Sequence, residues 1–167
     1  ANRMNILIKN LLELASLEKK ETYVLKEYDL SKVVELAVLT FDAKAFEEGI
    51  KLESMIDSNI KFNFDSYSMN ELVEILLDNA LKHTDKKSTI FVSLKEQGNN
   101  IILSVTDTGD IIPNGEEEKI FERFYRLDKS RRRKDNRYGL WLAIAKNIVV
   151  NHKGKICAKS IGNETVF

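Results

Sequence analysis

The chain has 167 residues, of which 43% are hydrophobic and 31% are charged, enough for one hydrophobic core with one additional element. Lysine plus arginine equals aspartate plus glutamate at 26 each, so the charge balance excludes a general attraction to nucleic acid or to an acidic membrane surface. The single Cys157 excludes an internal disulfide, and its apolar neighbours predict a buried strand position in a reducing compartment.

Residues 2–21 are predicted to form one helix. Its apolar residues recur at spacings of three and four; they are Met4, Leu7, Ile8, Leu11, Leu12, Leu14 and Ala15. The segment could pack simply as a core helix, but so broad an apolar face on one short helix needs partner helices to cover it.

Residues 23–30 are predicted to form a strand-like connector, after which Ser31 is well placed to cap a helix over residues 32–48. Gly49 is expected to end that helix. Two short apolar runs follow, at residues 50–56 and 60–64. Because Asp57, Ser58 and Asn59 separate them, these runs are predicted to pair as a hairpin.

The strongest helical pattern runs from Ser68 to Thr84, with one continuous apolar face. A strand pair is then predicted at residues 89–96 and 100–107, joined by a turn at Gly98-Asn99. A further helix is expected at residues 138–149. The last hairpin is predicted at residues 155–161 and 164–167, where the final strand is expected to be cut short. These elements predict an α+β fold, a two-layer sandwich with about three helices on one face of a mixed sheet.

One edge of the Ser68–Thr84 helix is polar and carries Asp78, Asn79, Lys82 and His83. A carboxamide oxygen beside a lysine suits a divalent cation and the phosphates that it bridges. An edge of this kind is also common on ordinary solvated helices, so its residues alone do not identify a site.

Three further motifs follow this helix in order: Asp107-Thr108-Gly109, the run Ile120–Arg126, and the helix from Tyr138 to Val149. Together the four segments resemble the ATP-binding domain of sensor histidine kinases, in the Bergerat-type ATPase superfamily. The resemblance covers about residues 2–167. Leu7–Glu18 is similar to the second helix of the dimeric four-helix bundle in that family, which implies a dimerisation segment at 1–21 and an ATP-binding domain at 22–167.

The resemblance implies a role for each motif residue. Asn79 would hold Mg²⁺, Lys82 would approach a phosphate, and His83 would lie near the sugar and base. Asp107 would accept the exocyclic amine of adenine, followed by Gly109 of the same motif. Arg126, Arg131 and Gly139 would belong to the lid and phosphate loop. Simpler interpretations stay open, because His83 could end a helix and Asp107 could form a turn.

Three departures from the family pattern fall at the implied site. Ile75 replaces an amide or acid four residues before Asn79, and Ile111 replaces a glycine. Around the start of the last helix the family has several glycines, of which only Gly139 is present here. Arg137 and Trp141 occupy two of the other glycine positions. Side chains at glycine-only backbone angles cost energy and obstruct a ligand. The sequence therefore predicts that ATP and Mg²⁺ bind weakly or not at all.

The sequence leaves two main functions open. The chain is either the catalytic half of a histidine kinase, which transfers the γ-phosphate of ATP to a histidine on the absent first bundle helix, or a pseudokinase-like regulatory or dimerisation module. An anti-sigma-factor kinase is a third reading, against which the Leu7–Glu18 segment argues. The resemblance implies a homodimer through the N-terminal helix and a response regulator as partner, and the neutral charge balance argues against nucleic acid as a partner.

No run approaches the roughly 18 consecutive apolar residues that cross a bilayer, and the first residues lack a signal-peptide pattern. The chain is therefore expected to be a soluble, cytoplasmic domain. Any membrane anchor of its parent sensor would lie in upstream segments outside this sequence.

Overall fold

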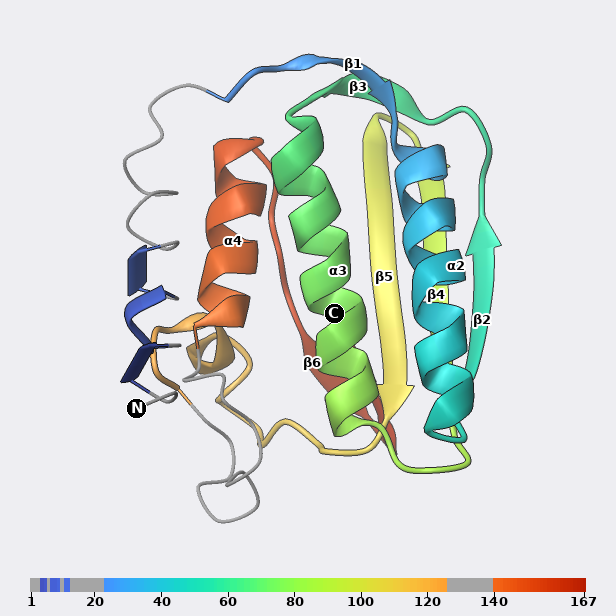
Figure 1. The fold of residues 1–167 in the computed structure, drawn as a ribbon, viewed down its shortest axis with the longest axis vertical. Helices are drawn as coiled ribbons and strands as arrows, with labels where there is room; N and C mark the ends of the chain where they lie inside the picture. The colour runs from blue at the N-terminus through green and yellow to red at the C-terminus, as the bar shows by residue number, and fades with distance from the viewer. Residues whose placement is uncertain (1–3, 6, 10, 13–22, 126–139) are drawn as a thin grey trace.

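The computed structural model describes residues 4–5, 7–9, 11–12, 23–125 and 140–167. Its elements follow one another along the chain as shown in Figure 1. They are β1 (Lys26–Asp29), α2 (Leu30–Glu47), β2 (Lys51–Ile56), β3 (Lys61–Phe64), α3 (Ser66–His83), β4 (Thr89–Gln97), β5 (Asn100–Thr108), η1 (Lys119–Phe121), α4 (Trp141–Asn151), β6 (Lys159–Ile161) and β7 (Glu164–Val166).

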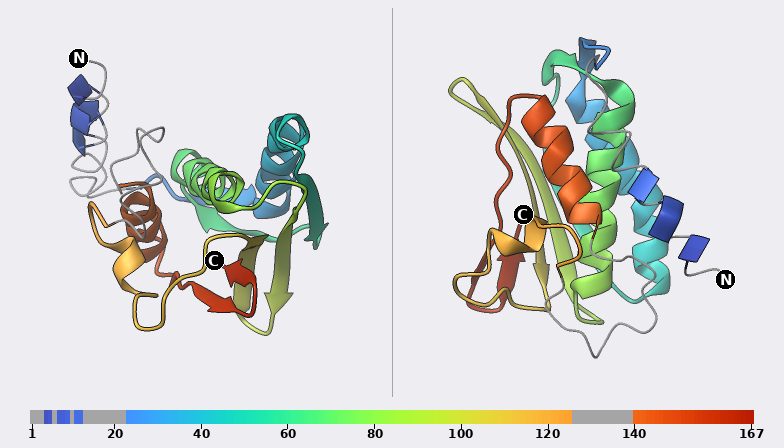
Figure 2. Two further views of the ribbon diagram at one scale, coloured as in Figure 1. Left: turned by 90° about the horizontal axis from the view of Figure 1, so that it is seen from below. Right: turned by 90° about the vertical axis from the view of Figure 1, so that its left-hand side faces the viewer.

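A five-stranded mixed sheet forms one layer, in the order β2-β4-β5-β7-β6. Strands β2 and β4 run parallel, whereas the other neighbours in this sheet are antiparallel. Helices α2, α3 and α4 lie side by side on one face of the sheet, as the views in Figures 1 and 2 show. The predicted α+β sandwich is confirmed.

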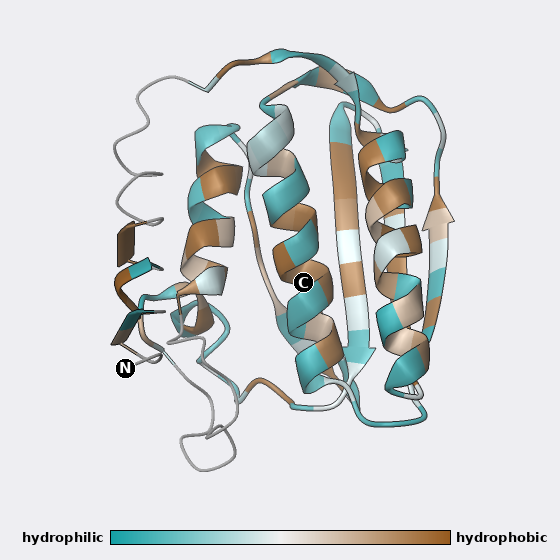
Figure 3. Ribbon diagram, in the orientation of Figure 1, coloured by the Kyte–Doolittle hydropathy of each residue, from teal (hydrophilic) through white to brown (hydrophobic). Residues whose placement is uncertain are grey.

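Helix α3 is the central element of the helical layer, between α2 and α4 (Figure 1). Ten of its residues are buried, and they recur at three and four as a core-facing stripe requires. Bands of hydrophobic and hydrophilic residues alternate along it in Figure 3. The predicted bounds, Ser68 to Thr84, are nearly correct. The helix begins slightly earlier because Asp65 caps its start, where its side chain accepts a hydrogen bond from the backbone N–H of Ser68 at 2.9 Å.

The predicted hairpin of residues 50–56 and 60–64 is wrong, although both strands exist. Strand β2 pairs with β4 in the large sheet, whereas β3 pairs with β1 in a separate two-stranded sheet. The backbone N–H of Asp57 donates to Leu94 at 2.9 Å, and the N–H of Leu30 donates to Ile60 at 2.8 Å. These long-range bonds separate the two strands, and local turn residues could not reveal them.

The predicted cap of the second helix is also wrong. Asp29 caps α2, since its side chain accepts a 3.0 Å hydrogen bond from the N–H of Ser31. The hydroxyl of Ser31 instead donates to the carbonyl of Asp57 and accepts from the N–H of Ile60. Ser31 therefore secures the irregular link between β2 and β3. Gly49 follows the end of α2 with φ of 72°, as predicted.

The remaining strand pairs agree with the sequence. Strands β4 and β5 are antiparallel around Gly98, which has φ of 61°, and β6 and β7 form the last hairpin. Residues 155–158 are not in β6, however, and Cys157 is exposed, so its predicted burial in a strand is wrong. The expected helix at 138–149 is observed from Trp141, because Tyr138 and Gly139 lie outside the described residues.

The described residues of the N-terminal segment are helical. Leu7 packs against the main core, whereas Met4, Ile8 and Leu12 are exposed. None of the helices in the described residues has the length and apolar character that a bilayer crossing requires.

Candidate functional site

The C-terminal end of α3 and the end of β5 are joined by a short polar network. The hydroxyl of Thr84 donates to the carbonyl of Thr108 at 2.9 Å, and the N–H of Asp110 donates to the carbonyl of His83 at 3.1 Å. Thr84 and Gly109 also form an isolated antiparallel bridge. The structure thus brings the polar end of the central helix to the Asp107-Thr108-Gly109 motif.

Gly109 is required by the close approach of these two segments. A Cβ atom at this position would lie 1.7 Å from the carbonyl oxygen of His83 and 2.7 Å from its carbonyl carbon. Its φ angle is outside the left-handed region, so space, and not backbone freedom, selects glycine here. A role of Gly109 in binding a cofactor stays a prediction.

Asp107 is a buried carboxylate whose acceptor capacity is unused. It is 1% exposed, and within the described part of the chain neither Oδ1 nor Oδ2 has a hydrogen-bond partner. Burial, followed by the negative charges of Asp110 and Asp85, raises its pKa from 3.8 to about 7. Buried polar groups are normally satisfied, so the two oxygens of this carboxylate are acceptors available to a donor group.

His83 contacts Asp110, a residue that the sequence analysis did not single out. The Nδ1 atom of His83 lies 2.8 Å from Oδ2 of Asp110, and both side chains are partly exposed. Asp110 was missed because no motif in the sequence assigned a role to this position. The pair shows that His83 faces the turn after β5.

Lys82 and Asp78 belong to a charge cluster that reaches α2. The Nζ atom of Lys82 lies 3.6 Å from Oδ2 of Asp78, and the Nζ atom of Lys44 lies 3.2 Å from Oδ1. The side chain of Asp78 is only 8% exposed, so its predicted place on the polar margin is wrong. Lys44 was also missed, because 34 residues separate it from Asp78.

Asn79 is half-buried on α3, one turn after Ile75. Ile75 is 3% exposed and forms part of the main hydrophobic core. Ile75, which departs from the family pattern, therefore contributes to the packing of α3. Whether Asn79 holds a metal ion stays a prediction.

The expected backbone strain at two of the substituted glycine positions is wrong. Ile111 is 54% exposed, and neither it nor Trp141 has a positive φ angle. Trp141 begins α4 and packs, partly buried, against the main core. An energetic cost from left-handed geometry therefore does not arise at these two residues, and only the volume of their side chains could weaken a ligand.

Other predicted residues lie outside the description. Arg126, Arg131, Arg137 and Gly139 fall in the range 126–139, which the structure does not describe. Before this range, Ile120 and Phe121 are buried together with Ile112 and Ala158, so Phe121 packs in a small second apolar cluster. Phe124 differs, since it is 52% exposed.

Comparison with known proteins places this geometry in a family. Residues 64–167 match the family described as histidine kinase-, DNA gyrase B-, and HSP90-like ATPase. The sensor protein DltS of Streptococcus agalactiae is 35% identical over 157 residues, which cover 93% of this chain and 40% of DltS. The sensor-like histidine kinase SenX3 of Mycobacterium tuberculosis is 31% identical, with coverage of 93% and 38%.

The fold has counterparts among solved structures. The histidine kinase ThkA, in complex with the response regulator protein TrrA, superposes with a TM-score of 0.81 at 21% identity, over 99% of this chain and 47% of that chain. At this identity the likeness concerns the fold alone. The chain spans about two fifths of the length of the curated relatives it matches.

Proposed function

The chain belongs to the histidine kinase-, DNA gyrase B-, and HSP90-like ATPase family, as a histidine kinase catalytic domain of the two-component sensor type, and from this premise we propose that it binds Mg·ATP weakly between the end of α3 and the end of β5. The bound nucleotide would supply a γ-phosphoryl group for a histidine on a helical bundle. The observation that carries the proposal is the buried Asp107, whose two carboxylate oxygens have no donor among the described residues.

The chemistry of Asp107 fits an adenine base. An ionised carboxylate only accepts hydrogen bonds, so it pairs with an exocyclic amine and rejects a carbonyl at the same place. Because burial holds the pKa of Asp107 at about 7, the carboxylate is only partly ionised near neutral pH. A donating amine would stabilise the charged form and satisfy the orphaned oxygens.

The polar end of α3 fits the phosphates and their metal ion. We assign the carboxamide oxygen of Asn79 to Mg²⁺, which takes few protein ligands when phosphates provide the others. Lys82 would contribute positive charge to the phosphates. Phosphoryl transfer depends mainly on such positioning and charge stabilisation, so these residues would hold the reactant and would not react themselves.

Weak binding is part of the proposal. The side chains of Ile111 and Trp141 occupy positions where the family resemblance implies glycine, and each adds volume next to the implied phosphate path. The His83–Asp110 and Lys82–Asp78 contacts also engage polar groups that a nucleotide would need. We therefore expect a dissociation constant for Mg·ATP well above the micromolar range.

Calorimetric titration with Mg·ATP and Mg·GTP tests the site. We expect weak binding of Mg·ATP and weaker binding of Mg·GTP, and an Asp107→Leu variant is expected to lose about tenfold or more in affinity for Mg·ATP. Glu53→Gln, a change at an exposed position on the edge strand β2, serves as the control and should bind as the wild type does. Micromolar affinity in the wild type would contradict the weak site, and equal affinity of the Asp107→Leu variant would contradict the assignment of Asp107.

A regulatory module that holds no nucleotide is the second candidate, favoured by the packing of Trp141 against the core at the start of α4. The variant Ile111→Gly/Arg137→Gly/Trp141→Gly separates the two functions. Tighter Mg·ATP binding by this variant would support an eroded nucleotide site. If neither the wild type nor the folded variant binds Mg·ATP at millimolar concentration, the regulatory module is the better description.

The proposed partners follow from the N-terminal helix and from the family. Exposed Met4, Ile8 and Leu12 fit a helix that packs against a second copy and a bundle. ThkA is solved with the response regulator protein TrrA, and we propose a response regulator as partner here also. We further propose that the parent is a membrane-anchored sensor with this domain in the cytoplasm, through segments outside this sequence.

The chain alone should not autophosphorylate. It contains two histidines, and neither lies in a phosphoacceptor motif. His83 contacts Asp110, and His152 contacts Asp65 and Ile148. Stable incorporation of acid-labile phosphate from ATP into this chain by itself would contradict this expectation.

A further inference from the structure

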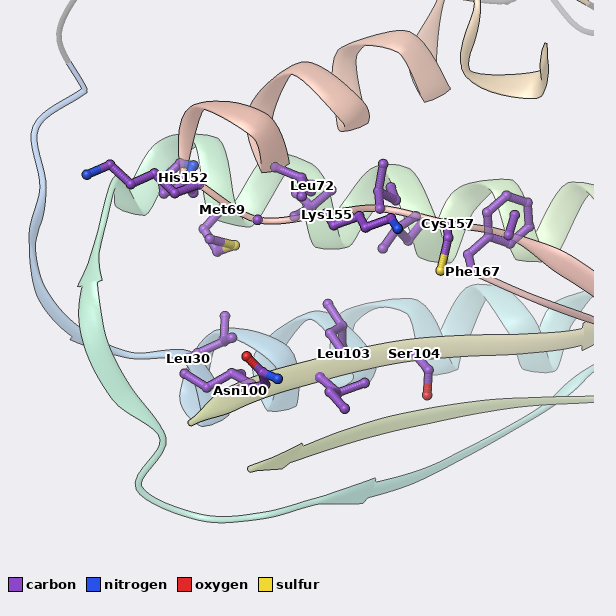
Figure 4. A pocket seen from close by; sticks show the side chains of 18 of the residues that line it. Leu30, Met69, Leu72, Asn100, Leu103, Ser104, His152, Lys155, Cys157 and Phe167 are labelled. Carbon is purple, nitrogen blue, oxygen red and sulfur yellow. The ribbon is translucent and has the colours of Figure 1, made fainter. Parts of the chain in front are cut away.

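Helices α2 and α3 lie side by side and run in the same direction (Figure 1). Near their starts, Leu30 of α2 and Met69 and Leu72 of α3 border one cavity with apolar side chains (Figure 4). Near their ends the contact becomes ionic, because the Nζ atom of Lys44 on α2 lies 3.2 Å from Oδ1 of Asp78 on α3. This ionic end of the helix pair is the one next to the candidate nucleotide site.

Asp78 brings one negative charge to two lysines. Its Oδ2 atom lies 3.6 Å from the Nζ atom of Lys82, which is one turn further along α3. The side chain of Asp78 is 8% exposed, whereas those of Lys44 and Lys82 are 51% and 34% exposed. Removing the cation from a carboxylate buried to this extent is costly. If one lysine leaves Asp78, the other must therefore stay.

Lys82 stands between two sides of α3. It follows Asp78 by four residues and Asn79 by three, and both spacings make neighbours on a helix. Its ammonium can therefore turn toward Asp78 or toward the side of Asn79, where the phosphates are proposed to lie. To bind a phosphate there, Lys82 must give up its contact with Asp78.

Lys44 is held in place independently of any ligand. It lies in the last turn of α2, where a positive charge interacts favourably with the end of the helix. Its Nζ atom lies 5.9 Å from the centroid of the Phe41 ring, and Phe41 packs against the main core. Lys44 is therefore the lysine that can stay with Asp78 when Lys82 moves.

We propose that Lys44 is a positioning residue of the Mg·ATP site, which neutralises Asp78 and so releases Lys82 to the phosphates of the nucleotide. This inference rests on the proposed function, because it takes the phosphate side of α3 as the destination of Lys82. Lys44 acts through Asp78 and contacts neither the nucleotide nor the metal ion. Without Lys44, the buried charge of Asp78 would hold Lys82 more strongly.

A double-mutant cycle tests the route through Asp78. The variants are Lys44→Met, Asp78→Asn and the two combined, and NMR titration with Mg·ATP gives the dissociation constants. We expect Lys44→Met to raise the dissociation constant about threefold or more, and to have no further effect once Asp78 is replaced. Asp78→Asn alone should not weaken binding, since it sets Lys82 free. A full effect of Lys44→Met in the Asp78→Asn background would overturn the proposal, because Lys44 would then act on the phosphates directly.

Two matched variants control for charge. Lys44→Arg keeps the cation beside Asp78 and should bind Mg·ATP as the wild type does. Lys61→Met removes the same charge from an exposed position on β3, near the starts of α2 and α3 and away from the site (Figure 1), and should also leave binding unchanged. If Lys61→Met weakened binding as much as Lys44→Met, only the net charge would matter and the proposal would be overturned.

Adenosine, which lacks phosphates, separates positioning from a general structural role. Lys44→Met should leave the affinity for adenosine unchanged while it weakens Mg·ATP binding. Equal losses for the two ligands would overturn the proposal, because Lys44 would then maintain the fold of the whole site. This comparison needs no Asp78 variant, so it decides even if Asp78→Asn does not fold.

The hydrogen exchange of the Lys82 ammonium, measured by NMR without ligand, reports on its contact with Asp78 directly. In Lys44→Met we expect this exchange to slow about threefold or more, because Asp78 then holds Lys82 more strongly. Unchanged exchange would overturn the proposal whether or not Mg·ATP binds. If exchange slows but the wild type binds no Mg·ATP, the proposed function is contradicted while the control of Lys82 by Lys44 stands.

Discussion

The imidazole Nδ1 of His83 lies 2.8 Å from Oδ2 of Asp110, while the N–H of Asp110 donates to the carbonyl of His83 at 3.1 Å. The same two residues are thus joined through both side chain and backbone. This double contact holds the end of α3 against the turn after β5. Gly109 and the buried Asp107 are fixed by the same junction.

Gly109→Ala tests how tightly this junction is packed. The new Cβ would lie 1.7 Å from the carbonyl oxygen of His83, so backbone must move, and we expect the free energy of unfolding to fall by about 2 kcal/mol or more. Gly154→Ala is the control, since its Cβ would meet a side-chain atom of Val149 at 3.0 Å. Urea unfolding measures both, and an equal loss in the two variants would contradict the close approach at Gly109.

The stability of the fold should decrease with rising pH because of Asp107. The pKa of Asp107 is raised to about 7 in the folded chain, mainly by burial. In the unfolded chain the same carboxyl has an ordinary pKa of about 4. The folded state therefore holds the proton more strongly. Its contribution is fully present below about pH 4 and is lost as the pH rises to about 7, with a slope of at most about 1.4 kcal/mol per pH unit.

The variant Asp107→Asn isolates this effect from other carboxyl groups. It keeps the size of the side chain but cannot ionise, so the decrease in unfolding free energy between about pH 4 and about pH 7 should be smaller than in the wild type. Urea unfolding across this pH range gives both curves. Parallel curves would show that Asp107 titrates at an ordinary pKa.

Asp110→Asn should lower the pKa of Asp107. Burial is the largest cause of the raised value, and the negative charges of Asp110 and then Asp85 add to it. Removing the charge of Asp110 should therefore reduce the pKa of Asp107 below about 7 without restoring 3.8. Carbon-detected NMR titration of the Asp107 carboxyl measures the change, and Asp85→Asn should produce a smaller decrease in the same direction.

Local sequence patterns predicted most elements of the fold. The period of apolar residues identified α3, and the Gly98-Asn99 turn identified the β4–β5 pair, because both depend on neighbours within a few residues. The partners of β2 and β3 depend on distant strands, and for them a local turn was misleading. Ser31 failed as a cap for the same reason, since its hydroxyl bonds to Asp57 and Ile60.

Those parts of the candidate site that belong to sequence motifs were predictable. Asp107 and the polar end of α3 were found from the sequence, and the structure joins them. Lys44 and Asp110 were missed, because Lys44 acts from another helix and no motif assigned a role to Asp110. The real reason for Gly109, the adjacent carbonyl of His83, is a tertiary contact that no single-sequence pattern contains.

His152 is expected to be important for stability, through two hydrogen bonds at the end of α4. Its Nε2 accepts from the N–H of Asp65 at 3.1 Å, and its Nδ1 lies 2.7 Å from the carbonyl of Ile148. These contacts imply a neutral ring with the proton on Nδ1, and they tie α4 to the start of α3. His152→Phe keeps the ring, whose centroid lies 5.1 Å from that of Tyr23, but removes both bonds and leaves the N–H of Asp65 without its acceptor.

We expect this variant to lose about 1 to 3 kcal/mol of unfolding free energy. Asn151→Ala is the matched control on the same turn, because Asn151 is exposed and its bond to the hydroxyl of Tyr23 lies at the surface. Its effect should stay within about 0.5 kcal/mol. Urea unfolding compares the two variants with the wild type. If His152→Phe were as stable as Asn151→Ala, the imidazole would act only as a packed ring, and the connection between α4 and α3 would depend on apolar contacts alone.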